Sequence, residues 1–254
     1  MTRRVGAGVG LMALVAALPL VGCGAPPGLR SAAEVEMSFL TACARRGGMP
    51  VPADNTRVVD ASGFSVTLPE HGWCRVDAGG LSGFVVPVLS PQEIAERGGR
   101  LTPAERSHSA FVAAAALARG AHGAALRSPA GMRRALVAAA APGGQDAAGE
   151  RLLPLSAGGR FRLVSVEVGA LRPDGCVPVR TEVEERDNPV MPPGAVLRLR
   201  DERRYCVGPG GRGAAVTFSE RFDAADPDAE ARGARVRALA ERVFDSLRFE
   251  APAR

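Results

Sequence analysis

The chain has 254 residues and a formal net charge of +5, and all 32 of its basic residues are arginines. Without lysine it can form no Schiff base and supply no P-loop lysine, so two common kinds of catalytic site are excluded. The arginines are spread along the sequence and aromatic residues make up only 4% of it, which argues against nucleic-acid binding.

The N-terminal segment has the pattern of an export signal. Two arginines precede an apolar run over residues 5–20, which is too short to cross a bilayer comfortably. The boundary Leu20-Val21-Gly22-Cys23 resembles the lipobox of bacterial lipoproteins. That resemblance implies cleavage before Cys23, diacylation of its sulfur and attachment to the membrane through the lipid. An uncleaved anchor helix, or an ordinary signal peptide with a chance cysteine, is the alternative.

These features divide the chain into a signal peptide over residues 1–22, a lipidated tether over 23–35 and one globular domain over 36–250. We expect the domain on the extracytoplasmic face of the cell membrane, held there through Cys23. If the host has two membranes, Gly24 resembles the residues that permit sorting to the outer membrane. An envelope protein is a further candidate partner, and no cofactor is expected.

Four cysteines lie beyond Cys23, namely Cys43, Cys74, Cys176 and Cys206. An even number in an exported chain indicates two disulfides, with three connectivities. We favour Cys176–Cys206, because each cysteine lies in a strand-like run of the same segment, and Cys43–Cys74 then follows by elimination. A zinc site is not expected, because the chain has no C-x-x-C pair and no histidine near these cysteines except His71.

The first part of the domain predicts one helix followed by strands. Residues 31–46 contain helix formers and are closed by two glycines. Further on, Phe64, Val66 and Leu68 alternate with polar residues, as in a strand with one buried face. The run GFVVPVL over residues 83–89 is another strand candidate, which Pro87 places at a sheet edge or near a bulge.

The middle of the domain is predicted to be helical. Ser90, Thr102 and Ser128 each precede a proline, the pattern of an N-cap followed by proline at the first helical position. Two alanine-rich runs, over residues 110–120 and 132–144, are both closed by glycine. We expect these helices to cover a sheet face, because alanine buries little area of its own.

Residues 151–222 are predicted to be β. The run over 161–168 has apolar residues on both faces, which favours a central strand. The runs over 176–186 and 195–200 alternate apolar residues with arginine or glutamate, which predicts one wet, ion-paired sheet surface. In the run over 214–222, Val216, Phe218 and Phe222 share one buried face.

The last element is a helix that Asp226-Pro227 is expected to cap. Its apolar residues fall three and four positions apart in one stripe that must pack on the sheet: Val236, Leu239, Ala240, Val243, Phe244 and Leu247. The expected fold class is therefore α+β, with an antiparallel sheet covered by helices and closed by this amphipathic helix.

The order of elements also resembles a known family. A strand and turn reading GFSVTLPEHGW, an antiparallel region and a closing helix that ends VFDSLRF are similar to the photosystem extrinsic protein PsbP and its bacterial lipoprotein relatives. The resemblance implies an α/β/α sandwich over most of residues 57–249, with assembly and binding roles instead of catalysis. The long alanine-rich middle is a departure from that pattern.

Two motifs that often carry chemistry fit structural roles better in this chain. GPGGRG over residues 208–213 satisfies the dinucleotide pattern, but a strand-like run follows it, so we expect a hairpin loop. The acidic residues near 185 interleave with arginines, which favours a neutralised solvent face over a calcium site; they are Glu182, Glu184, Glu185 and Asp187. The single tryptophan, Trp73, is expected to fill the core at a strand end.

No set of residues forms a self-consistent active site, so we expect a non-catalytic binding or assembly module. One alternative is an envelope hydrolase that uses Cys74 with His71, or a serine–histidine pair such as Ser109 with His108, although no G-x-S-x-G motif surrounds the serine. Another alternative is a solute-binding lipoprotein of a transporter, which would usually need two larger lobes.

Overall fold

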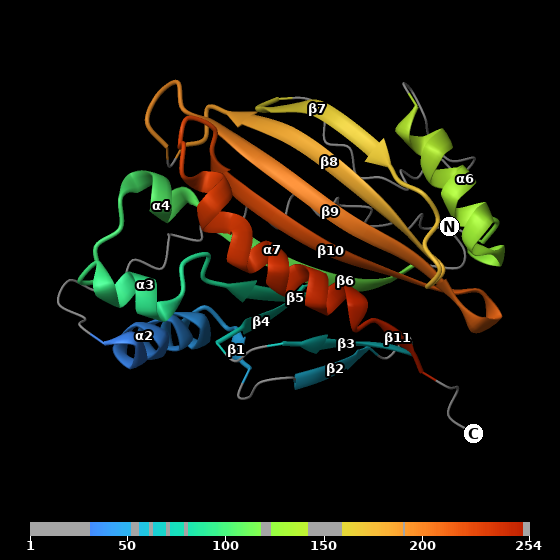
Figure 1. The fold of residues 1–254 in the computed structure, drawn as a ribbon, viewed down its shortest axis with the longest axis horizontal. Coiled ribbons are helices and arrows are strands. Elements are labelled where there is room, and N and C mark those ends of the chain that lie inside the picture. The colour runs from blue at the N-terminus through green and yellow to red at the C-terminus, as the bar shows by residue number, and fades with distance from the viewer. Residues whose placement is uncertain are drawn as a thin grey trace, which may run out of the picture.

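An eight-stranded antiparallel sheet forms the centre of an α+β fold in the computed structural model (Figure 1). The structure describes residues 31–51, 56–60, 63–69, 72–78, 81–117, 123–141, 159–189 and 191–250. Across the large sheet the strands run in the order β1 (Met49–Pro50), β4 (Cys74–Ala78), β5 (Leu81–Val86), β6 (Ser109–Leu117), β10 (Arg212–Asp223), β9 (Val196–Gly208), β8 (Cys176–Arg186) and β7 (Phe161–Val168).

A helix and a small second sheet cover one face of the large sheet, which we call the front face (Figure 1). The helix is α7 (Ala229–Asp245), and the small sheet contains β2 (Thr56–Asp60), β3 (Phe64–Leu68) and β11 (Arg248–Phe249). The main hydrophobic core lies between these layers and contains the predicted stripe of α7, the alternating face of β3 and the fully buried Trp73. These sequence predictions are confirmed.

Two helices pack on the opposite, back face of the large sheet. Helix α2 (Ala32–Arg45) buries Phe39 against β5 and β6, and α6 (Pro129–Ala140) buries Met132 and Leu136 against β8 and β9. The short helices α3 (Pro91–Glu96) and α4 (Pro103–Ser107) connect β5 to β6, and the 3₁₀ turns η1 (Ala125–Arg127) and η2 (Pro209–Gly211) lie in loops.

Four predicted helix starts are confirmed by their capping contacts, whereas α7 is capped by Asp228 instead of the predicted Asp226, and the Asp228 side chain makes no capping hydrogen bond. Ser31, Ser90 and Thr102 each accept a hydrogen bond from the backbone N–H three residues on, and the glutamate there bonds back to the cap. Ser128 caps α6 in the same way without a glutamate. In α3, α4 and α6 a proline follows the cap, where its missing N–H leaves no helical hydrogen bond unmade.

The alanine-rich run after residue 109 is a correction, because it forms strand β6 and not a helix. It pairs with β5 on one side and with β10 over nine residue pairs on the other. Ala110, Val112 and Ala114 point into the main core beneath α7. Pairing on both sides holds this run extended, so tertiary structure overrides the helical propensity of alanine here.

Two strands lie at other places in the sheet than the sequence indicated. β7 is an edge strand, not a central one: a register shift between Leu163 and Ser165 turns all of its packed apolar residues toward the back face and leaves Val164 exposed. β5 lies inside the sheet, not at its edge, because it ends at Val86 and Pro87 falls just beyond the last pair.

Candidate functional site

Both predicted disulfides are present, Cys43–Cys74 and Cys176–Cys206. The first fastens α2 to β4, and the second joins directly opposed residues of β8 and β9. All four cysteines are at most 5% exposed. Disulfides form and persist in oxidising compartments, so this pairing is typical of a protein that folds outside the cytoplasm.

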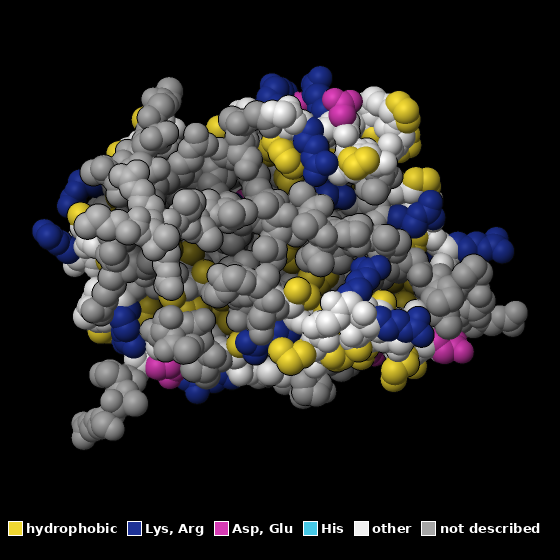
Figure 2. All heavy atoms as spheres, turned by 180° about the vertical axis from the view of Figure 1, so that it is seen from behind, with side chains coloured by type: hydrophobic (Ala, Val, Ile, Leu, Met, Phe, Trp, Pro, Cys, Tyr) yellow, Lys and Arg dark blue, Asp and Glu magenta, His cyan; other side chains and the backbone are white. Residues whose placement is uncertain are grey.

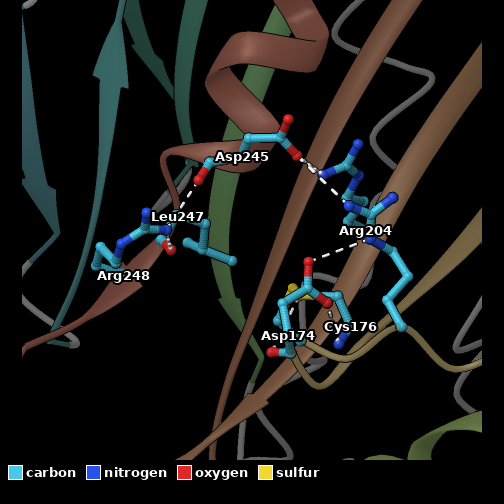
Figure 3. Close-up of a disulfide and its surroundings, with 8 residues drawn as sticks. Asp174, Cys176, Arg204, Asp245, Leu247 and Arg248 are labelled. Atoms are coloured by element: carbon cyan, nitrogen blue, oxygen red, sulfur yellow. Dashed lines mark hydrogen bonds and ion pairs between the residues drawn. A yellow bond between two sulfur atoms is a disulfide. The ribbon is translucent and has the colours of Figure 1, made fainter.

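Charged side chains surround the Cys176–Cys206 disulfide on the front face (Figure 3). The Asp174 carboxylate accepts a hydrogen bond from the Cys176 backbone N–H at 3.0 Å, which shapes the turn before β8. Beside it, Arg204 reaches from β9 to the last turn of α7 and donates to Asp245 at 2.6 Å. These contacts attach the end of α7 to the sheet.

The sequence candidates for catalysis are not brought together. The sulfur of Cys74 is bonded to Cys43 and so offers no thiolate, and both His71 and the lipidation candidate Cys23 lie outside the described residues.

GPGGRG connects β9 to β10 as a hairpin, with Gly210 and Gly211 at φ of 69° and 70°. Within the described ranges, no three metal-ligating side chains cluster, and no helix is long and apolar enough to span a membrane.

The predicted ion-paired surface is confirmed on the front face of β8 and β9. Its pairs join neighbouring strands and are partly exposed: Arg162–Glu184, Arg180–Glu202 and Arg198–Glu182. Glu185 departs from this pattern. It points to the back face, is 1% exposed and accepts a hydrogen bond from Asn188 at 2.8 Å.

A buried ionic network lies where α4, β10 and α7 meet. Glu220 of β10 is fully buried and accepts hydrogen bonds from His108 Nε2 at 2.8 Å and from Arg237 at 2.8 Å. We call this set the His108 network; its members are His108, Arg200, Glu220, Asp226, Glu230, Arg232 and Arg237. Its three arginines face three carboxylates, so its charges balance.

Both ring nitrogens of His108 lie within hydrogen-bonding distance of neighbouring side chains. Arg232, which can only donate, lies 3.4 Å from His108 Nδ1, so this nitrogen accepts while Nε2–H donates to Glu220. Both ring nitrogens are therefore occupied, so neither is free to activate a serine. The cavity beside His108 measures about 40 Å³, enough for a few water molecules and far below the roughly 300 Å³ of a small-molecule pocket. The His108 network is structural.

Gly233 of α7 gives a test of how tightly this network is packed. A Cβ at Gly233 would lie 1.8 Å from Glu220 Oε1 and 2.5 Å from Arg237 Nη1. In an ordinary helix interior, glycine to alanine stabilises by about 0.5–1 kcal/mol. Here we expect Gly233→Ala to lower the free energy of unfolding by about 1–3 kcal/mol, as overpacked cores do. Urea denaturation measures the change.

The control is Ala234→Gly, at an exposed position of the same helix, which should lower the free energy of unfolding by about 1 kcal/mol or less. A Gly233→Ala variant that is more stable than wild type would contradict the packing described.

Asp226 gives the network a pH dependence. Burial by itself would raise the pKa of Asp226, but the Arg232 hydrogen bond, the Asp228 backbone N–H and the nearby positive charge outweigh burial and hold that pKa below its ordinary value. The charged carboxylate therefore stabilises the fold above about pH 4, and this contribution is lost as the pH falls through the lower, folded-state pKa. We expect Asp226→Asn to flatten the decline in unfolding free energy between pH 5 and pH 2.5. Equal slopes for wild type and Asp226→Asn would contradict the assignment.

A second group of buried polar side chains lies on the back face of the three central strands. Its members, which we call the polar belt, are at most 8% exposed: Thr181 and Glu185 of β8, Asp201 and Arg203 of β9, and Thr217, Ser219 and Arg221 of β10. Thr181, Asp201 and Ser219 lie directly opposite one another across the strands. The belt thus crosses the sheet as a continuous strip.

Apolar clusters surround the polar belt on the same sheet face. Along the strands, the belt lies between the apolar side chains that pack against α6, which include Tyr205, and those around Leu199. Across the strands, Ser219 of β10 is paired with Phe111 of β6, which belongs to the apolar cluster packed against α2. Figure 2 views the molecule from this side. Buried polar groups weaken a sheet face unless they are well paired. A role in stability alone therefore does not explain why this buried strip is polar.

Pairing within the polar belt is incomplete. Arg203 donates to Asp201 at 2.6 Å, and Glu185 lies 2.9 Å from Arg160 and 3.6 Å from Arg221. However, the Nε atoms of Arg203 and Arg221 and the Oε2 atom of Glu185 are buried without a hydrogen-bond partner. Leaving such a group unsatisfied costs about 1–3 kcal/mol. Among the described features, the belt is the best candidate binding site.

Sequence reasoning missed the polar belt. In the sequence, Arg203, Thr217 and Ser219 are ordinary positions of alternating strands, because a periodicity of two does not show which face another layer covers. The belt could have been found from two polar residues, Asp201 and Arg203, on the otherwise apolar face of β9. Thr217, Ser219 and Arg221 form the matching polar series on β10.

Comparisons with known proteins give no family. No family model and no curated protein matches the chain. Among solved structures, the Saccharomyces cerevisiae Ran-binding protein Mog1p shares 11% identity at a TM-score of 0.38, covering 78% of this chain and 96% of that one. Human StAR-related lipid transfer protein 5 shares 11% identity at a TM-score of 0.28, covering 85% of this chain and 93% of that one. Similarities at this level do not identify a shared function, and the PsbP resemblance stays a prediction.

Proposed function

We propose that the chain is an exported lipoprotein, anchored by lipid on Cys23, whose α+β domain binds a ligand or an envelope partner without catalysing a reaction. The observation that carries the binding role is the polar belt, a strip of buried and incompletely paired charged groups. The two disulfides support an oxidising compartment. The lipobox-like boundary before Cys23 supports the anchor, because two or three acyl chains hold a domain stably on a membrane.

The alternatives have less support. A hydrolase that uses Cys74 is disfavoured because its sulfur is in a disulfide, and one that uses His108 is disfavoured because Glu220 and Arg232 occupy both ring nitrogens. A transporter-linked solute-binding protein usually has two comparable lobes, whereas the described residues form layers around one large sheet. No specific observation favours either alternative over a binding module.

The anchor is tested by mass spectrometry of the protein extracted from host membranes. We expect the mature chain to begin at Cys23 and this residue to carry the mass of attached acyl chains. Cys23→Ser should remain unprocessed and lose the acyl mass, while Gly24→Ser, which leaves Leu20-Val21-Gly22-Cys23 intact, should keep both. An unmodified Cys23 in wild-type protein that still fractionates with membranes would overturn the lipoprotein proposal.

A further inference from the structure

The side of helix α2 that faces away from the sheet carries few charges for an exposed surface. We call it the α2 outer face; its exposed residues are Ala33, Glu34, Met37, Thr41, Ala44 and Arg45. Met37 is 63% exposed, the highest value for a large hydrophobic residue in the described part of the chain. The carboxylate of Glu34 already accepts a hydrogen bond from the backbone N–H of Ser31 at 2.9 Å. A helix side in water normally carries charged residues, so this composition is typical of a contact surface.

Helix α7 is the internal comparison. Its exposed positions include four charged residues, namely Glu230, Glu241, Arg242 and Asp245. None of the exposed large hydrophobic side chains of the described ranges lies on α7. An exposed helix side in this protein can therefore be strongly polar, and the α2 outer face is not.

Arginines lie at the C-terminal end of the α2 outer face. Arg45 is in the last turn of the helix and Arg46 is its C-cap, and both are exposed. Met37, Thr41, Arg45 and Arg46 are among the described residues that line one open depression, so the apolar and basic groups share one surface. An apolar centre beside basic residues suits the boundary between the headgroups and acyl chains of an anionic membrane.

The proposed anchor keeps this surface close to a membrane. Cys23 and Ser31, the exposed cap of α2, are eight residues apart, so the chain between them spans at most about 29 Å. Figure 1 places α2 at one end of the fold, far from α6. A short tether raises the effective concentration of the attached surface, so a contact with the membrane needs little affinity of its own.

From the exposed Met37, the neighbouring arginines and the short tether, we infer that the α2 outer face lies on the anionic membrane surface to which Cys23 is attached. Met37 enters the headgroup region, and Arg45 and Arg46 pair with lipid phosphate groups, which guanidinium groups bind through charge-assisted hydrogen bonds. This inference rests on the proposed lipoprotein function and adds an orientation, in which the α2 end of the domain faces the membrane and the α6 end faces away.

The test uses the acylated mature protein in vesicles of phosphatidylcholine and phosphatidylglycerol whose acyl chains carry bromine, a quencher of tryptophan fluorescence. The single native tryptophan, Trp73, is fully buried, so a tryptophan introduced at the surface reports on its own surroundings. We expect brominated lipid to reduce the added emission of Met37→Trp by about half or more, because that side chain enters the headgroup region. The control Ala234→Trp, at an exposed position of α7 on the front face, should lose less than about a tenth.

A second pair of variants tests the arginines. In the Met37→Trp background, Arg45→Gln combined with Arg46→Gln should reduce the quenching about twofold or more. The matched control is Arg133→Gln combined with Arg134→Gln, which removes two adjacent exposed arginines from α6 and should leave the quenching unchanged.

The inference is overturned if brominated lipid quenches Met37→Trp no more than Ala234→Trp, or if the Arg45 and Arg46 replacements have no effect. Protection of Met37→Trp from aqueous acrylamide without quenching by brominated lipid would show a protein occupant, such as a second copy of the chain, and would also overturn it. Flotation of the same vesicles measures the anchor separately. Acylated protein that floats without quenching of Met37→Trp refutes the α2 contact alone, whereas unacylated protein that does not float refutes the lipoprotein proposal and this inference with it.

Discussion

Replacing Glu220 with glutamine is expected to lower the free energy of unfolding by about 3–5 kcal/mol. Glu220 is fully buried and is the shared acceptor of His108 and Arg237, with Arg200 at 3.9 Å. The neutral amide would leave the partly buried Arg237 guanidinium with the exposed carboxylate of Glu230, at 3.3 Å, as its remaining described ion-pair partner. Removing one partner of a buried ion pair costs far more than removing an exposed one, because the other charge stays buried.

The control for Glu220 is Glu230→Gln in the same network. The Glu230 side chain is 61% exposed, although it pairs with Arg200 at 2.6 Å and with Arg237 at 3.3 Å. Exposed pairs contribute about 1 kcal/mol or less, so this variant should unfold almost like wild type. Urea denaturation of both variants at pH 7 gives the comparison. Equal losses for Glu220→Gln and Glu230→Gln would show that burial does not govern the network.

Removal of either disulfide is expected to lower the free energy of unfolding by about 3–4 kcal/mol. The paired double variants are Cys43→Ala with Cys74→Ala, and Cys176→Ala with Cys206→Ala. Their sequence separations are 31 and 30 residues, so restriction of the unfolded chain predicts nearly equal losses. Each pair fastens a different part of the fold, α2 to β4 or β8 to β9.

Guanidinium denaturation with and without dithiothreitol measures these losses. The reducing agent should destabilise wild type by the sum of the two effects and each double variant by the effect of its remaining disulfide. Wild-type stability that does not respond to dithiothreitol would contradict the role of the disulfides. Markedly unequal losses would instead show that native packing around one cysteine pair, and not loop length, sets its contribution.

Local patterns predicted most elements of the fold. The caps at Ser90, Thr102 and Ser128, with proline after each, located three helix starts, because capping depends on residues within one turn. The stripe of α7 located the core-facing side of the last helix for the same reason. The disulfide pairing also followed from the sequence, because two cysteines in adjacent strand-like runs of one segment favour each other.

Long-range neighbours decided what local patterns could not. The run after Ser109 has a helical composition, yet pairing with β5 and β10 makes it a strand. The bulge after Leu163 depends on β8, and the position of β5 depends on which strand lies beyond Val86. Such pairings join residues far apart in the chain, so no window of sequence contains them.

The sequence by itself therefore determined where most helices begin, the alternating faces of most strands and which cysteines pair, since each depends on residues close together or on a small set of partners. Only the tertiary structure decided that Glu220 meets His108 on the front face of the large sheet while Arg203 meets Asp201 on its back face. Charge compensation depends on distances between side chains from different strands and helices.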